Sequence, residues 1–345
     1  MLPLLQRLPR VQPRLSSLVA VITAGILADL AGVPLGWMLG PAFVGLLLAA
    51  LNNPIGSDGP LGNWGRGLLG ASVGGMLQSQ HLLILLNTPE LLLVTGGYVL
   101  SAGFLGWLWL TRICGWQSQS GWYAALPGGL SEMVELTRQA EGRAYEVALA
   151  HTLRIFLLLS LAAVAVAFVH DGPWAGFALP PLALSNALML FVVVWVGLVF
   201  GNRIRLPAHS VMGPLLISAL FSFLLDWHLS VNEHLVIVAQ LAIGWSLAHR
   251  FQGSSFPQIR SGLWQITGML LCLIPLWGLA AWAVVMLTEH SLAVMLLAFA
   301  PGGQAEMALI ALLLGASPAV VVTLHVLRVV LILSFASRWY PGKNR

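Results

Sequence analysis

The chain carries the same series of short motifs twice. The heptapeptide PGGLSEM at 127–133 recurs as PGGQAEM at 301–307, and the tetrapeptide HTLR at 151–154 recurs as HVLR at 325–328. Earlier landmarks also recur in the same order and at a nearly constant offset: Pro34, Gly40-Pro41 and Gly70-Ala-Ser72 match Pro207, Gly213-Pro214 and Gly244-Trp-Ser246. Self-similarity at a fixed offset indicates a duplicated folding unit. The sequence therefore predicts two membrane repeats, residues 1–175 and 176–345, within one integrated domain.

Both repeats consist of apolar segments that are mostly long enough to cross a membrane. A crossing helix needs about 20 apolar residues, and the segments are approximately 15–32, 34–52, 66–86, 91–111, 121–140 and 144–168, then 179–201, 206–225, 234–248, 262–288, 292–314 and 318–337. Only 8% of the residues are charged, against about 25% in soluble domains. These features predict an all-α, polytopic membrane protein and exclude a water-soluble enzyme.

The distribution of Lys and Arg predicts how the repeats are oriented. If each Pro-Gly-Gly segment enters the membrane and returns, the chain has about ten crossings in two inverted repeats. All Lys and Arg residues except Arg154 and Arg328 then lie on one side, together with both termini. A parallel arrangement would instead place four cations outside: Arg203, Arg205, Arg250 and Arg260. The positive-inside rule favours inverted repeats with cytoplasmic termini, in a bacterial-type inner membrane.

A duplicated set of ionisable residues lies within the apolar segments. Its members are Glu132, His151 and Arg154 in the first repeat, and Glu306, His325 and Arg328 in the second. Ionisable groups inside a membrane are costly and mark functional sites by default. Each buried arginine also needs a partner. The candidates are the glutamate of either repeat, exposed backbone carbonyls or an anionic ligand.

The Pro-Gly-Gly steps predict a broken helix in each repeat. Proline cannot continue a helix, and the glycines Gly128, Gly129, Gly302 and Gly303 relax the backbone. A half-helix that starts after each break directs its positive N-terminal end into the protein. Paired breaks in inverted repeats are the best sequence indication of a transporter's central site.

A purely structural role for the same residues stays open at this stage. Glu132 stands three residues after Gly129, where a glutamate at the third helical position can cap its own helix. The Glu and Arg side chains could equally form ion pairs that lock the repeats together.

Other chemistry finds little support in the sequence. Cys114 and Cys272 have no paired spacing, and neither a nucleotide-binding loop nor a catalytic triad spacing is present. The cations are scattered singly, without a basic cluster for nucleic acid. We therefore expect no metal, no cofactor, no nucleic-acid partner and no enzymatic activity. The sequence gives no indication of oligomeric state.

The two Pro-Gly-Gly-x-x-Glu-Met segments, with Arg154, Arg328 and the Leu-Gly-Pro at 39–41, resemble the AbrB-type integral membrane family. The resemblance covers essentially the whole chain and implies the same membrane domain in duplicate. Members are labelled variously as ammonia monooxygenases, as regulators of gene expression or simply as membrane proteins. The monooxygenase label would require clustered histidines as copper ligands, whereas His151 and His325 each stand alone in their repeat.

The leading interpretation is a secondary transporter of a small organic anion or weak acid, with its site between the repeats. The arginines would neutralise the substrate or a carboxylate, and the Glu and His side chains would carry a coupling proton. The expected partners are the lipid bilayer and a small-molecule or ion ligand. The alternative is a membrane-embedded sensor that regulates gene expression through a partner protein, without net transport.

Overall fold

The computed structural model describes residues 15–53, 60–77, 88–169, 184–225, 233–314 and 316–336, and this part of the chain is helical without strands. The described elements of the first half are α1 (Leu15–Leu30), α2 (Gly36–Ala50), α3 (Leu61–Gly75), α5 (Glu90–Leu108), the π-helical turn η1 (Trp109–Ile113), α6 (Ser118–Ala125), α7 (Leu130–Gln139) and α8 (Ala144–Val169). Those of the second half are α9 (Leu184–Arg203), α10 (His209–Leu225), α11 (Glu233–Arg250), α12 (Phe256–Val285), α13 (Leu292–Phe299), α14 (Gln304–Leu313) and α15 (Pro318–Phe335).

Several of these helices have the length and composition of membrane spans. In the described ranges, five helical stretches qualify: Glu90–Ile113, Ala144–Val164, Asn186–Arg203, Phe256–Val285 and Pro318–Phe335. Three shorter helical stretches are also apolar: Ser17–Leu30, Gly36–Ala50 and His209–Leu224. The helices expose large apolar side chains outward, as Leu93, Trp195 and Leu271 do, which suits contact with lipid rather than water. The predicted all-helical class is confirmed for the described residues, and the apolar helices are consistent with a multi-pass membrane protein.

Helices from the two halves of the sequence pack against each other at equivalent positions. Helix α3 packs on α10, and its counterpart α11 packs on α2. A side chain at Gly70 would overlap the carbonyl of Val211, and one at Gly244 would overlap that of Met38. Met38 and Val211 occupy equivalent positions of the two repeats, so the same close contact is made twice. Small residues allow this approach of helix backbones in a membrane.

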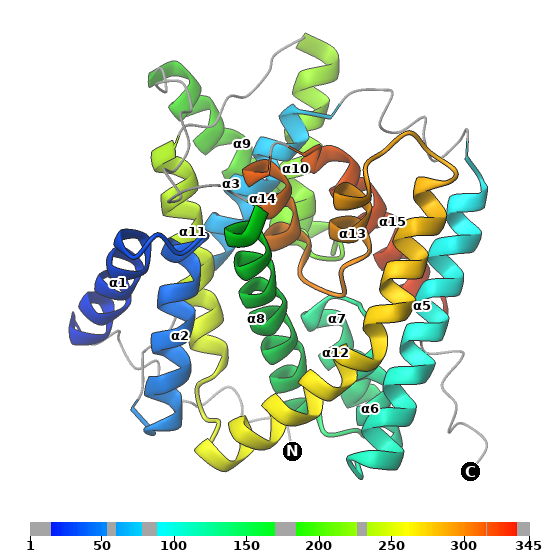
Figure 1. Ribbon diagram of the computed structural model, residues 1–345. Helices are drawn as coiled ribbons and strands as arrows, with labels where there is room; N and C mark the ends of the chain where they lie inside the picture. Colours follow the sequence, from blue (N-terminus) through cyan, green and yellow to red (C-terminus); the bar gives the residue numbers. More distant parts are fainter. Residues whose placement is uncertain are drawn as a thin grey trace.

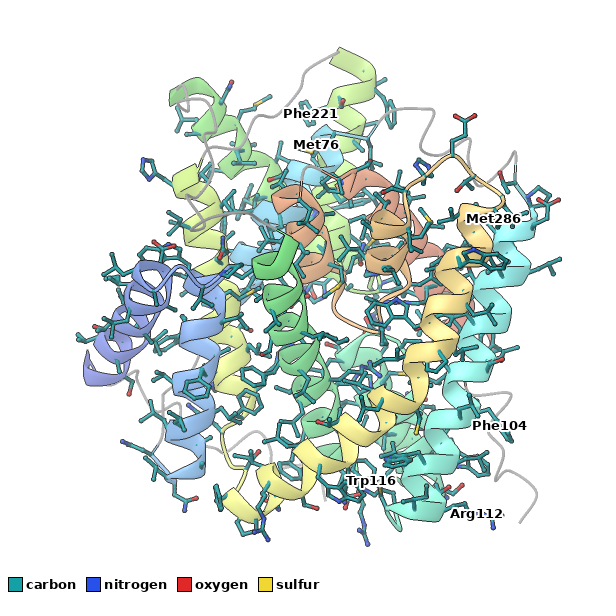
Figure 2. All side chains as sticks on the ribbon, in the orientation of Figure 1. Met76, Phe104, Arg112, Trp116, Phe221 and Met286 are labelled. Carbon is teal, nitrogen blue, oxygen red and sulfur yellow. The ribbon has the colours of Figure 1, made fainter. Side chains whose placement is uncertain are left out.

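Helices α5 and α12 lie side by side and run in opposite directions (Figure 1). Helix α5 starts at Glu90 and leads into η1, which contains Arg112. Helix α12 ends next to Met286, and Figure 2 places Met286 and Arg112 at opposite ends of the molecule. Helix α12 is the repeat counterpart of α5, so this pair of equivalent helices points in opposite directions.

Each Pro-Gly-Gly step separates two short helices, as predicted. Helices α6 and α13 have 8 residues each, and α7 and α14 have 10 residues each. At about 1.5 Å per residue these lengths are far below a hydrocarbon thickness of about 30 Å. The pair α6 and α7 forms one hairpin and the pair α13 and α14 another, and their connecting loops, which we call the hairpin tips, face each other near the middle of the molecule (Figure 1).

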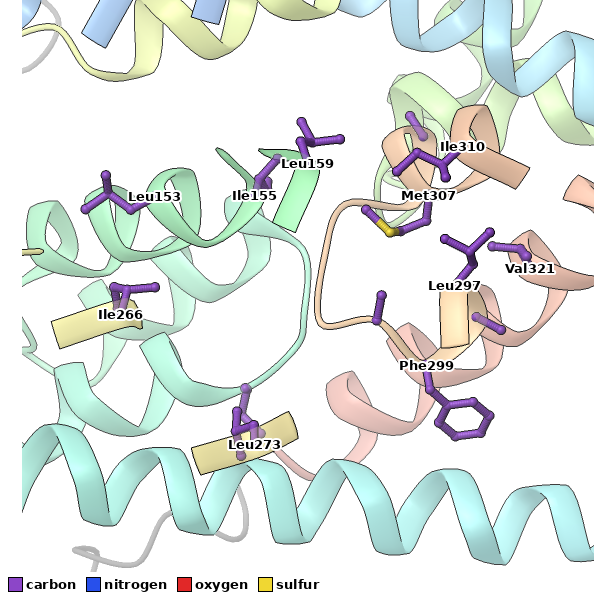
Figure 3. Packing of buried hydrophobic residues seen from close by; sticks show 14 of the residues in the cluster. Leu153, Ile155, Leu159, Ile266, Leu273, Leu297, Phe299, Met307, Ile310 and Val321 are labelled. Atoms are coloured by element: carbon purple, nitrogen blue, oxygen red, sulfur yellow. The ribbon is translucent and has the colours of Figure 1, made fainter. Parts of the chain in front are cut away.

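The hairpin tips are embedded in one apolar cluster that joins both halves. Figure 3 shows Ile155 and Leu159 of α8 near the first tip, and Leu297, Met307 and Val321 around the second. The helices that carry these side chains, α8 and α13 to α15, come from both repeats. Irregular backbone at membrane depth is tolerated only where protein or a cavity surrounds it, and this cluster supplies the protein part of that environment.

Candidate functional site

The first hairpin tip is bound by two side chains of α8. The Nη1 of Arg154 donates to the carbonyl oxygens of Ala124 at 3.2 Å and Leu126 at 3.1 Å. The Nε2 of His151 donates to the carbonyl of Tyr123 at 3.0 Å. The last carbonyls of a helix have no partner within that helix and carry partial negative charge. Arg154 therefore satisfies and neutralises the C-terminal end of α6.

The second hairpin tip is bound in the same way by two side chains of α15. The Nη1 of Arg328 donates to the carbonyl of Ala300 at 2.5 Å, and its Nη2 donates to that of Gly302 at 3.2 Å. The Nε2 of His325 donates to the carbonyl of Leu297 at 3.2 Å. The histidine contacts and one arginine contact of each tip occur at equivalent positions of the two repeats. The duplicated His and Arg side chains therefore bind the hairpin tips of the two repeats in the same way.

The contacts of His151 define its protonation. Its Nε2 must be a donor, because a backbone carbonyl only accepts. Its Nδ1 lies 3.2 Å from the Nη2 of Arg154, and a guanidinium only donates, so Nδ1 accepts. His151 is consequently a neutral imidazole that carries its proton on Nε2. Both of its ring nitrogens hold the hairpin tip and Arg154.

The two glutamates do not pair with these arginines. The Oε1 of Glu132 accepts a hydrogen bond from the backbone N–H of Ala208 at 2.9 Å, which links α7 to the segment before α10. Glu306 is buried, with 5% of its surface exposed. Ion pairs between described residues form elsewhere, as in Arg138–Glu135 and Arg143–Glu146. The candidate partners of Arg154 and Arg328 were the glutamates, backbone carbonyls or an anionic ligand. In the structure both arginines bind backbone carbonyls.

Two glycines provide the space that these carboxylates occupy. A Cβ atom at Gly129 would overlap the Oε2 of Glu132, and one at Gly303 would overlap the Oε2 of Glu306. The φ angles of these glycines, −69° and −75°, are accessible to any residue. Glycine is therefore required because it leaves space for the carboxylate, and not because of its backbone conformation. Each carboxylate folds back over the first turn of its own half-helix, where the helix dipole favours negative charge.

A cavity of about 150 Å³ lies where the two hairpin tips meet. Nine of the ten predicted site residues line it: Gly128, Gly129, Glu132, His151, Arg154, Gly302, Gly303, Glu306 and Arg328. His325 does not line it and is fully buried behind the second tip. The cavity therefore brings together matching residues of the two repeats.

Two further arginines line the cavity, Arg66 of α3 and Arg250 of α11. Arg66 donates from Nε to the Oγ of Ser210 and from Nη1 to the Oγ of Ser246, each at 3.2 Å. Its Nη2 donates to the Oδ1 of Asn63 at 2.8 Å. In the sequence both arginines belong to the scattered cations that predict the topology. They are the principal residues of the site that the sequence did not predict.

A helical spacing is the signal that could have identified Arg66. It precedes Gly70 by four residues, and residues four apart share one face of a helix. Gly70 is the position at which α3 touches α10, so Arg66 lies on the face that packs on the other repeat. Arg250 follows Ser246, which is also part of a recurring landmark, by four residues.

The cavity is positively charged. Its lining contains four arginines and two glutamates, so cations exceed anions by two. The N-terminal ends of α7 and α14 also reach it, through Ser131 and Gln304, and helix N-termini favour anions. Within the described ranges, no group of three or more His, Cys, Asp or Glu side chains is arranged to hold a metal ion. The arrangement is suited to binding a small anion.

Comparison with known proteins places residues 37–341 within a family model described as "Transition state regulatory protein AbrB". A protein of Escherichia coli (strain K12) named "Putative regulator AbrB" is 26% identical over 308 residues, which cover 87% of this chain and 88% of the relative. A protein of Bacillus subtilis (strain 168) named "Uncharacterized protein YhjN" is 25% identical over 360 residues, with 93% and 91% covered. No solved structure matches the chain.

Proposed function

This chain belongs to the AbrB family, and we propose that it is a secondary transporter of a small organic anion or weak acid. The observation that carries the proposal is the meeting of two oppositely directed hairpin tips at one positively charged cavity. Transporters recurrently bind their substrate where broken helices from two repeats meet, with half-helix N-termini directed at anionic groups.

The two glutamates are the proposed carriers of a coupling proton. Glu132 and Glu306 line the cavity at the first turns of the half-helices, where they can reach a bound anion. A carboxylate at membrane depth that alternates between charged and neutral forms is a common element of proton-coupled transport. His151 is a weaker candidate, since its Nε2 donates to the hairpin tip and its Nδ1 accepts from Arg154.

We further propose inverted repeats with about ten crossings and cytoplasmic termini in a bacterial-type inner membrane. The opposite directions of α5 and α12 support this topology (Figure 1). Cations and acids also lie at opposite ends of these two helices. Arg112 follows α5 and Arg260 lies in the first turns of α12, at one end. Glu90 opens α5 and Glu289 follows α12, at the other end. The terminal cations used in the sequence analysis lie outside the described residues: Arg7, Arg10, Arg14, Arg338, Lys343 and Arg345.

Cysteine accessibility tests this topology. In a background with Cys114→Ala and Cys272→Ala, Arg260→Cys should react with a membrane-impermeant maleimide only in inside-out vesicles. Glu289→Cys should react in intact cells, since inverted repeats place it on the outer side. A parallel arrangement would place residue 260 outside, so labelling of Arg260→Cys in intact cells would contradict the proposal.

Solute counterflow tests the transport function. Purified protein in liposomes loaded with an unlabelled small organic acid should accumulate the same labelled acid transiently, for at least one member of a panel. Glu306→Gln should alter the pH dependence of proton-coupled uptake, and Arg112→Gln, at the exposed end of η1, should behave like the wild type. Absence of counterflow for acids that bind the folded protein would overturn the proposal.

A second candidate, a ligand-dependent regulator, is favoured by one observation, the name "Putative regulator AbrB" of the Escherichia coli relative. In that case a ligand would bind the cavity without being moved. A partner protein recovered with the full-length chain only in the presence of that ligand would support the regulator. Counterflow of the same ligand would support the transporter.

A further inference from the structure

We propose that the anion is a small dicarboxylate, and that Arg66 and Arg250 bind its carboxylates while Arg154 and Arg328 hold the hairpin tips. The inference rests on the proposed function, because it assigns the ligand of the same cavity. It separates the four arginines of the cavity into two pairs with different roles.

The first pair is engaged with the backbone. Arg154 and Arg328 each donate two hydrogen bonds to carbonyls of a hairpin tip, and each is only 3% exposed. Both belong to the duplicated unit and occupy the same position of the His-x-Leu-Arg motif in each repeat. Each arginine binds the broken-helix loop of its own repeat. Residues that maintain the fold of each repeat are expected to make the same contact in both.

The second pair breaks the symmetry of the duplication. When the two repeats are aligned on the Pro-Gly-Gly and His-x-Leu-Arg motifs, Arg66 corresponds to Gln240 and Arg250 corresponds to Met76. The two arginines come from α3 and α11, which are themselves repeat counterparts. Because the equivalent positions of the other repeat carry no cation, neither arginine is needed for the fold of a repeat. Their position in the cavity therefore indicates that they bind the ligand.

The surroundings of Arg66 preorganise it for an anion. Two hydroxyls and one amide oxygen, from Ser210, Ser246 and Asn63, orient its guanidinium. A planar guanidinium held in one orientation loses little further freedom when it binds a carboxylate. Ser210 and Asn63 also line the cavity and offer the ligand neutral polar groups.

Charge and volume define the class of ligand. Cations of the lining exceed anions by two, and the charge of a dianion balances that excess. The volume of about 150 Å³ corresponds to about five water molecules at about 30 Å³ each, the volume of a water molecule in the liquid. A four-carbon dicarboxylate fits this space, whereas a nucleotide does not.

Calorimetric titration of the purified full-length protein with succinate tests the inference, with butyrate as the monoanionic probe of similar length. We expect succinate to bind at least about tenfold more tightly than butyrate. Arg66→Gln and Arg250→Gln should each weaken succinate binding about tenfold or more, as expected for loss of a hydrogen bond to a charged group. Arg66→Lys should restore part of the affinity, and Arg112→Gln should leave it unchanged. The unfolding temperature without ligand should not change in Arg112→Gln. Arg66→Gln should lower it, because the variant loses the hydrogen bonds to Ser210, Ser246 and Asn63, so each variant is titrated well below its own unfolding temperature.

Three results would overturn the inference: no binding of succinate, equal binding of succinate and butyrate, or unchanged affinity in Arg66→Gln and Arg250→Gln. Its failure is distinguishable from failure of transport. Counterflow of a monocarboxylate alone would remove the dicarboxylate assignment and leave the transporter. Arginine-dependent succinate binding without counterflow would leave the assignment and remove the transporter.

Discussion

Replacing Arg328 with glutamine is expected to lower the free energy of unfolding by about 3 kcal/mol or more. The guanidinium donates to the carbonyls of Ala300 and Gly302, and glutamine is too short to reach both. Each buried carbonyl left without a donor costs about 1–3 kcal/mol. The measurement is equilibrium unfolding of the detergent-purified variant, compared with the wild type.

Two matched substitutions make this result specific. Arg260→Gln removes the same charge from an exposed position at the start of α12 and should change stability by less than about 0.5 kcal/mol. Arg328→Lys keeps the charge but presents no planar fork, so it should recover only part of the loss. Wild-type stability of Arg328→Gln, combined with lost ligand binding, would make Arg328 a ligand-binding group and would contradict its role in the hairpin tip.

Replacing Gly303 with alanine is expected to destabilise the protein by about 1–3 kcal/mol, the usual cost of overpacking, and to reduce transport strongly. The added methyl group would occupy the position of the Oε2 of Glu306, so the carboxylate must leave the first turn of α14. The backbone itself accepts alanine, since φ at this residue is −75°. Unfolding and counterflow measured on the same preparation give both readouts.

A double variant identifies the cause. Gly303→Ala with Glu306→Ala removes the group that the methyl displaces, so it should be more stable than Gly303→Ala alone. Gly97→Ala places a methyl group at an exposed position of α5 where nothing lies within 4 Å, so it should be neutral or slightly stabilising. If the double variant is no more stable than the single one, displacement of Glu306 is not the reason for the glycine.

The membrane helices, the paired breaks and most of the cavity could be predicted from sequence. A proline followed by two glycines interrupts a helix wherever it occurs, and the duplication indicated that both breaks serve one purpose. Intramembrane charges have few acceptable places. For these reasons nine of ten predicted site residues line one cavity.

The partners of the buried arginines could not be predicted in the same way. Carboxylates and backbone carbonyls both satisfy a guanidinium, and only the distance from α8 and α15 to the hairpin tips decides between them. In the structure the carbonyls of the broken helices are nearer, and Glu132 instead accepts from Ala208. The same limit applies to His151, whose neutral state follows from two contacts that no sequence pattern specifies.

The place of Arg66 and Arg250 in the cavity could not be predicted from the sequence for a different reason. A single arginine near the end of an apolar segment is typical of a topology determinant at the membrane surface. Their position in the cavity depends on how α3 and α11 pack on helices of the other repeat. That packing relies on small residues such as Gly70 and Gly244, whose contact partners lie in the opposite half of the sequence.

The most direct test of the central claim, that this cavity serves a transporter, is its accessibility from the two sides of the membrane. Ser131 lines the cavity and is exposed, so Ser131→Cys in the background without Cys114 and Cys272 reports its opening. We predict that an impermeant thiol reagent labels this cysteine in both right-side-out and inside-out vesicles, because a transporter opens its site to each side in turn. Labelling from one side only, in a variant that still binds the ligand, would contradict transport. The ligand-dependent regulator would then be the remaining candidate function.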